Sequence, residues 1–212
     1  TSMSSIKDAL PDNIDIDQME LDKKAASSIS KLYDAERSVG DALTQCAKKM
    51  KQAASEMQSY ADVAQEISRN YIQLVNRDSQ IVSNQVLHKL KEHLKRLDTT
   101  ITNQTELYNT MFEVASAYND YSDGLRDLSK SWDQLIDRQK SWRDADYELK
   151  KAQAKNNYEK YDKIEANVRK GKTEVIKAFN EKEGKDSFVS NAMVRVNQAW
   201  NLLKTRIKNI SW

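Results

Sequence analysis

Hydrophobic residues recur along most of the chain at alternating spacings of four and three. This spacing keeps apolar side chains on one face of an α-helix and is typical of coiled-coil packing. The first stripe predicts one long helix over residues 19–75, with a bend near Gly40. The apolar members of this stripe are Ala25, Ile29, Leu32, Val39, Leu43, Cys46, Met50, Ala53, Met57, Tyr60, Ala64, Ile67, Tyr71 and Leu74.

Two further stripes follow after short polar breaks in the pattern. One predicts a helix over residues 83–155, which would be about 110 Å long at 1.5 Å per residue. The other predicts a helix over residues 158–212 with a break or a kink near residue 184, where Gly184 would be the cap of a broken helix. Residues 1–18 are acidic and irregular and are expected to form a leader or linker. The sequence therefore predicts an all-α fold, an elongated antiparallel three-helix coiled coil.

The composition agrees with a chain of few, long helices. It holds one Pro and four Gly in 212 residues, whereas globular proteins average about 5% Pro and 7% Gly. A β-sandwich, a barrel or a doubly wound α/β fold needs many more turns, so we exclude these classes. A chain with 31% charged and 39% hydrophobic residues could also be disordered, but the regular spacing of its apolar residues argues against disorder.

Cysteine usage and hydropathy indicate a soluble, cytoplasmic protein. Cys46 is the single cysteine, so no disulfide can form within the chain. No apolar run reaches the ~18 residues that a membrane span needs, and no signal peptide is visible.

Large aromatic residues occur on the stripes in greater number than a thin three-helix bundle can cover. We therefore expect a dimer that packs two bundles into a six-helix core, with a two-fold dimer as the commonest closed form. The candidate interface residues are Trp132, Leu135, Trp142 and Trp200. The alternative is that these residues belong to the core of a monomer.

No arrangement of residues indicates catalysis. The two histidines, His88 and His93, are five residues apart and do not share a helix face, and His88 with Glu92 is best interpreted as a solvated pair. No Glu-x-x-His pair, P-loop or Gly-x-Gly-x-x-Gly motif is present. We expect no enzyme, no cofactor and no metal site.

Basic residues are more informative through their positions than through their number. The 34 basic and 32 acidic residues give a net charge of +2, which does not indicate nucleic-acid binding. Residues 140–185, however, hold 13 basic and 9 acidic residues around the predicted turn between the second and third helices. An anionic membrane attracts such segments, while the alternative is an ordinary solvated face. The candidate membrane-binding residues are Lys150, Lys151, Lys155, Lys160, Lys163, Arg169, Lys170 and Lys172.

With this layout, the chain resembles a BAR domain, and within that superfamily it is most similar to the BAR domain of the sorting nexins. The resemblance rests on Trp132-Asp133-Gln134, on Lys140 to Ala145 (Lys-Ser-Trp-Arg-Asp-Ala) and on Phe179 to Phe188, with Trp200 near the C-terminal end. Sorting nexins of this class carry a PX domain before the BAR domain, and these residues contain none.

The resemblance implies a protein that senses or remodels membrane curvature in endosomal sorting. It would act as a homodimer, or as a heterodimer with a related BAR protein, on anionic, phosphoinositide-containing membranes at the cytoplasmic face of endosomes. The rival interpretation is a structural coiled-coil tether or cytoskeletal adaptor in which charge only confers solubility, and a secreted helical effector is a further one.

Overall fold

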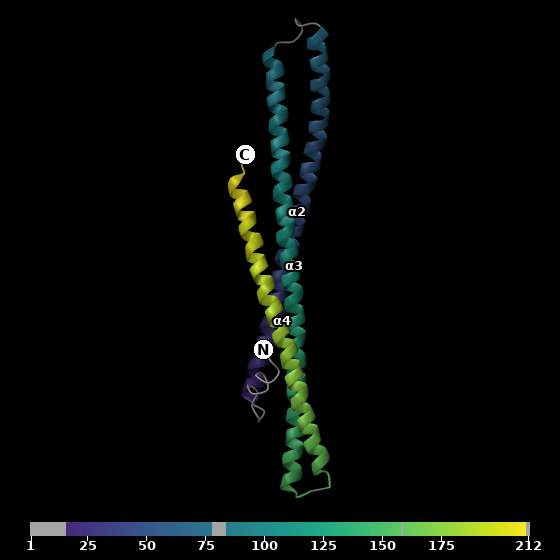
Figure 1. The fold of residues 1–212 in the computed structure, drawn as a ribbon, viewed down its shortest axis with the longest axis vertical. Coiled ribbons are helices and arrows are strands. Elements are labelled where there is room, and N and C mark those ends of the chain that lie inside the picture. Colours follow the sequence, from purple (N-terminus) through teal and green to yellow (C-terminus); the bar gives the residue numbers. More distant parts are fainter. Residues whose placement is uncertain (1–15, 78–83, 158, 211–212) are drawn as a thin grey trace. The chain divides into compact units, whose positions relative to one another are not determined.

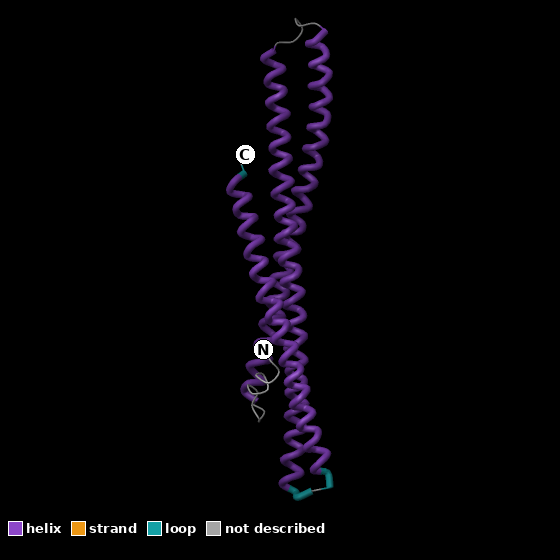
Figure 2. The backbone as a smooth tube through the Cα atoms, in the orientation of Figure 1, coloured by secondary structure: helices purple, strands orange, loops and turns teal. Residues whose placement is uncertain are grey.

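A computed structural model describes residues 16–77, 84–157 and 159–210 of the chain. Three long helices account for nearly all of these residues: α2 (Ile16–Arg77), α3 (Asn84–Ala154) and α4 (Tyr161–Asn209). Within the described ranges there is no β-strand (Figure 2). The prediction of an all-α fold is therefore confirmed.

The observed helices overlap the predicted ranges along most of their length. α2 begins three residues before the expected start at residue 19, so the last residues of the expected leader belong to this helix. Residues 1–15 of that leader lie outside the described residues. α4 begins at Tyr161, three residues later than expected.

The predicted break at Gly184 is wrong. α4 continues through this position, and no glycine in the described residues has a positive φ. A glycine inside a helix costs about 1 kcal/mol relative to alanine, which the contacts on either side of Gly184 offset. Lys182, for example, forms ion pairs with Glu183 and with Asp186, and the second of these pairs crosses Gly184.

The described residues form two compact units. Unit 1 comprises the N-terminal part of α2 up to Ser38 together with Tyr118–Arg195 of α3 and α4. Unit 2 comprises the rest of α2, α3 up to Ala117 and the C-terminal part of α4 from Val196.

Unit 1 has a core in which α3 packs against α4. Its fully buried members are Leu135 and Trp142 on α3 and Val175 and Ala178 on α4. The half-buried residues Trp132, Val168 and Phe179 pack around them. These residues repeat at spacings of three, four or seven, which places them on the facing sides of two antiparallel helices.

A buried lysine completes this core. Lys182 is only 6% exposed, and its Nζ lies 4.7 Å from the ring centroids of both Trp132 and Phe179. The same Nζ forms ion pairs of 2.6 Å with Glu183 and 3.3 Å with Asp186. A buried charge is tolerated only where such partners replace water.

In unit 2, α2 and α3 form an antiparallel hairpin whose two helices contact one another at Tyr60 and His93 (Figure 1). Every seventh residue of α2 on the contact face is small and buried. These residues are Gly40, Ala47, Ala54, Ala61 and Ser68. Small side chains let two helices approach closely, so this face forms the close contact, and the larger Tyr60 beside it lies edge-on against His93.

The two lines of residues in the predicted stripe of α2 differ in their exposure. Leu43, Met50, Met57, Ala64 and Tyr71 are half-buried, as expected for residues beside the contact. The other line is exposed within the described chain, because the small residues occupy the close contact. Its members are Leu32, Val39, Cys46, Ala53, Tyr60, Ile67 and Leu74.

Two helix glycines provide a test of close packing in unit 1. A Cβ atom at Gly171 would lie 3.2 Å from the Cα atom of Trp142, whereas a Cβ at Gly184 would meet nothing within 4 Å. We therefore expect Gly171→Leu to lower the free energy of unfolding by about 1–3 kcal/mol through overpacking. Gly184→Ala, the matched control, should raise it by up to about 1 kcal/mol. Urea unfolding followed by circular dichroism measures both, and equal effects of the two substitutions would contradict the close contact.

Candidate functional site

The turn that joins α3 to α4 is defined by a Schellman motif. Asn156 has a φ of 52°, in the left-handed region where asparagine is one of the few well-tolerated residues. Its N–H donates to the carbonyl of Gln153 at 3.2 Å, and the N–H of Asn157 donates to the carbonyl of Ala152 at 3.1 Å. The Asn-Asn pair that the sequence indicated as a weak point is thus the helix stop itself.

Side-chain contacts hold the two arms of this hairpin together. The amide of Gln153 on α3 donates to the hydroxyl of Tyr161 on α4 at 3.4 Å. Farther from the turn, Gly171 allows α4 to approach the backbone of Trp142. The hairpin therefore presents its surface side chains from two helices with a fixed spacing.

Most of the predicted basic residues are exposed around this turn. Between residues 146 and 172 the chain has eight basic and five acidic residues. Five of these basic residues are exposed lysines with no ion pair among the described residues. They are Lys151, Lys155, Lys160, Lys163 and Lys170. These five form the set that we call the hairpin lysines.

The three other candidates have partners within the hairpin. Lys150 forms an ion pair of 3.0 Å with Asp146. Arg169 is bonded to Glu165, and this hydrogen bond, with the charge of the carboxylate, raises the pKa of the guanidinium. Lys172 is half-buried, with its Nζ 6.0 Å from the ring centroid of Trp142. These residues have less charge available for an external anion than the hairpin lysines have.

Tyr147 is a site residue that the sequence analysis missed. Its side chain is 66% exposed on the last turns of α3, three and four residues before Lys150 and Lys151. Residues at these spacings share a helix face. A tyrosine has an apolar ring and a polar hydroxyl, which suits the boundary between water and lipid. The sequence does contain a signal for this residue: Tyr147 is an aromatic residue outside the apolar stripe of this helix, so it was to be expected on the surface next to Lys150 and Lys151.

The predicted dimer-interface residues are placed differently from expectation. Leu135 and Trp142 are 2% and 4% exposed in the core of unit 1, so almost none of either side chain is available to a second chain. Trp132 packs against the same core and is half-buried. Trp200 is half-buried in unit 2. For Leu135 and Trp142 the alternative interpretation, core residues of a single chain, describes their position.

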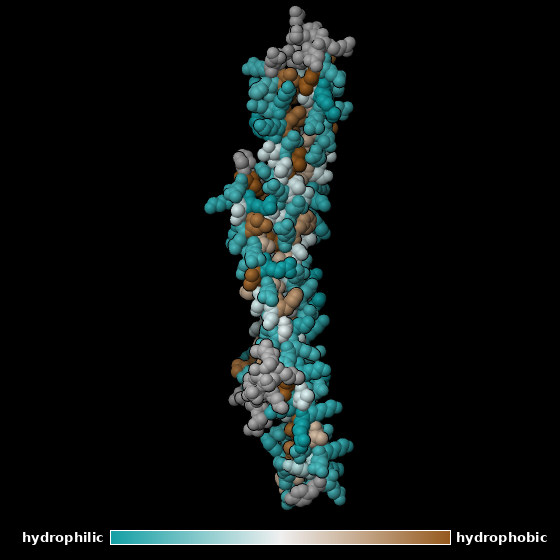
Figure 3. Space-filling model, in the orientation of Figure 1, coloured by the Kyte–Doolittle hydropathy of each residue, from teal (hydrophilic) through white to brown (hydrophobic). Residues whose placement is uncertain are grey.

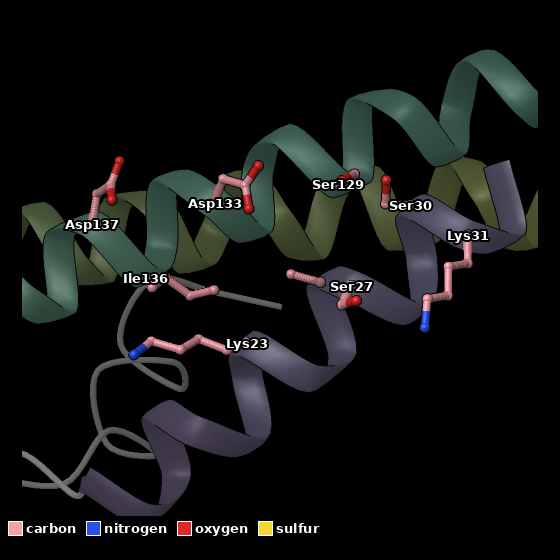
Figure 4. A pocket seen from close by; sticks show the side chains of 9 residues that line it. Lys23, Ser27, Ser30, Lys31, Ser129, Asp133, Ile136 and Asp137 are labelled. Carbon is pink, nitrogen blue, oxygen red and sulfur yellow. The ribbon is translucent and has the colours of Figure 1, made fainter. Parts of the chain in front are cut away.

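A groove of about 720 Å³ lies between α2 and α3 in unit 1 (Figure 4). Lys23 and Lys31 come from α2, and Asp133 and Asp137 from α3. In Figure 4 the lysine amines and the aspartate carboxylates point away from one another. Because these charged groups do not converge on a common point, the groove does not have the geometry of a small-molecule site.

Other chemistry has little support in the described ranges. No group of three or more His, Cys, Asp or Glu side chains there could hold a metal ion. His88 contacts Glu92 at 3.2 Å on the surface of α3, and His93 lies edge-on against Tyr60. None of the three helices, over its described residues, is long and apolar enough to cross a membrane.

Comparison with known proteins gives no match: no family model, curated protein or solved structure matches the chain.

Proposed function

We propose that the chain is a helical scaffold that binds anionic membranes through the hairpin lysines and acts as a dimer in sensing or remodelling membrane curvature. The observation that supports this function best is the exposed set of lysines at the α3–α4 turn. The same segment holds five acidic residues, of which Asp146 and Glu165 pair with Lys150 and Arg169, so the five exposed lysines outnumber the three remaining carboxylates.

The electrostatic gain from such a set is sufficient for reversible binding. An anionic membrane attracts each Lys or Arg near its surface by about 1 kcal/mol. The attraction is screened over about 10 Å at 0.1 M salt, so only residues close to the lipid contribute. Lys151, Lys155 and Lys160, the hairpin lysines nearest to the turn, satisfy this condition together.

The proposal extends to a BAR-type mechanism. Two rigid hairpins joined in a dimer would reach the membrane at once only where its curvature matches their spacing, so that binding favours the curved state. A phosphoinositide-containing endosomal membrane is the proposed target, at its cytoplasmic face. The partner is a second copy of the chain or a related BAR protein.

A coiled-coil tether is the second candidate function. It is favoured by the exposed apolar line on α2, which would suit pairing with another helix whether or not a membrane is present. The two functions differ in one respect that can be measured, because a tether has no reason to bind lipid vesicles.

Neutralising three hairpin lysines tests the membrane function. In the triple variant Lys151→Gln, Lys155→Gln and Lys160→Gln, we expect affinity for phosphatidylserine-rich vesicles at low salt to fall about a hundredfold, since each lysine contributes about 1 kcal/mol. Co-sedimentation with vesicles measures the affinity. Vesicles of phosphatidylcholine alone should bind neither protein.

The matched control is the triple variant Lys177→Gln, Lys204→Gln and Lys208→Gln. These lysines are also exposed, and the substitutions change the net charge by the same amount. Affinity should change by less than about threefold in this control, because the charges lie away from the turn. Equal loss in both variants would indicate attraction by net charge alone and would contradict a hairpin site.

Tyr147 provides a second test that does not alter charge. Tyr147→Ala should weaken vesicle binding by about tenfold, because the variant loses the partition of an aromatic ring into the lipid interface. Tyr147→Phe should retain most of the affinity. The thermal unfolding midpoint should be unchanged in both variants, since the side chain is 66% exposed. Unaltered binding of Tyr147→Ala would exclude this residue from the interface.

A further inference from the structure

One side of α2 in unit 2, next to its contact with α3, has exposed residues at heptad spacing. One line, which we call the outer line, consists of Val39, Cys46, Ala53, Tyr60, Ile67 and Leu74. A second line follows it three residues later along the helix, and consists of Ala42, Lys49, Glu56, Val63 and Asn70. Two lines separated by three and four residues are the arrangement of a coiled-coil seam.

The exposure of large apolar side chains on this seam is high. Tyr60, Val63 and Ile67 are 57%, 57% and 58% exposed, and Leu74 is 45% exposed. Figure 3 shows one face of the molecule, on which apolar side chains form a broken row between the two helices of the α2–α3 hairpin, with polar side chains on both sides. Apolar residues scattered singly on a surface need no explanation, but a row at constant helical spacing indicates an interaction surface.

The adjoining side of the same helix already has its partners. Ala47, Ala54 and Ala61 are at most 5% exposed. The helix thus has two different seams, one of small residues that is buried within the chain and one of exposed residues, of which Tyr60 also lies edge-on against His93 of α3. Each seam follows a seven-residue interval, so each suits a helical partner and not a globular surface.

We propose that the second seam pairs with the same seam of a second copy of this chain, in antiparallel orientation. Charge complementarity decides both the partner and the orientation. Lys49 and Glu56 are exposed, lie on the second line one heptad apart, and have no ion pair among the described residues. A two-fold axis near Gln52 and Ala53 would place each Lys49 opposite Glu56 of the second copy.

A parallel, in-register pair is disfavoured by the same residues. It would bring Lys49 against Lys49 and Glu56 against Glu56, and like charges facing one another destabilise a coiled coil.

The seam from residue 39 to residue 74 covers five heptads, about 54 Å at 1.5 Å per residue. This length is sufficient for stable pairing of two helices.

This inference deepens the proposed function, because it names the surface through which the dimer forms. It is tested in solution without lipid, so its failure differs from a failure of vesicle binding. The seam lies in unit 2, whereas Leu135 and Trp142, which the sequence offered as candidates for the dimer interface, lie in unit 1.

Charge exchange tests the pairing directly by sedimentation equilibrium. Lys49→Glu should weaken the dimer by about tenfold, since two attractive pairs become repulsive. The double variant Lys49→Glu with Glu56→Lys should restore the dimer.

A second pair of variants tests the apolar part of the seam. Ile67→Lys should weaken the dimer by about a hundredfold, whereas Gln65→Lys, on an exposed position outside the seam, should leave it intact. Circular dichroism should show unchanged helix content in all four.

Disulfide trapping tests the orientation. In the antiparallel pair the two Cys46 residues lie about 20 Å apart along the axis, beyond the reach of a disulfide. The variant Cys46→Ser with Ala53→Cys brings two cysteines close to the two-fold axis and should form a covalent dimer on oxidation. A covalent dimer through the native Cys46 would overturn the antiparallel arrangement. A monomeric wild-type chain, or a dimer insensitive to Ile67→Lys, would overturn the proposal itself.

Discussion

Close approach between helices is the constraint on which the described structure depends. A chain of three long helices can bury an apolar side chain only against another helix, and the distance between the helices decides which residues are buried. In unit 2 the small residues Ala47, Ala54 and Ala61 bring the helices together. In unit 1, Gly171 has the same role against Trp142. Larger residues beside these contacts are left on the outside, where they become available to other partners.

The sequence was sufficient for the fold class and for the approximate extents of the helices. Spacings of three and four depend only on the geometry of the α-helix, so they can be recognised without knowledge of the neighbours. The inward face of α2 could not be predicted, because its apolar surface is three residue lines wide. Both Ala54 and Ile67 lie on apolar lines, and only the packed structure shows that the small residue takes the contact.

Local signals for a helix end were wrong at one position and right at another. Gly184 predicted a helix end, yet α4 continues past it with Lys182 bound to aromatic rings and carboxylates on both sides. Asn156, by contrast, does end a helix, because its left-handed backbone and two hydrogen bonds satisfy the last carbonyls. At the candidate site the sequence predicted the basic residues, but it could not separate the unpaired Lys155 from Lys150, which is paired with Asp146. That distinction needs side-chain geometry.

The central claim is that the α3–α4 hairpin is the part of the chain that contacts lipid. Its most direct test is spin-label accessibility, which is practical because Cys46 is the single cysteine and can be replaced by serine. A label at Lys155→Cys should become more accessible to oxygen and less accessible to a polar nickel reagent when phosphatidylserine-rich vesicles are added. A label at Lys204→Cys should not change. Vesicle-bound protein in which the label at residue 204 responds, and the label at residue 155 does not, would contradict the account.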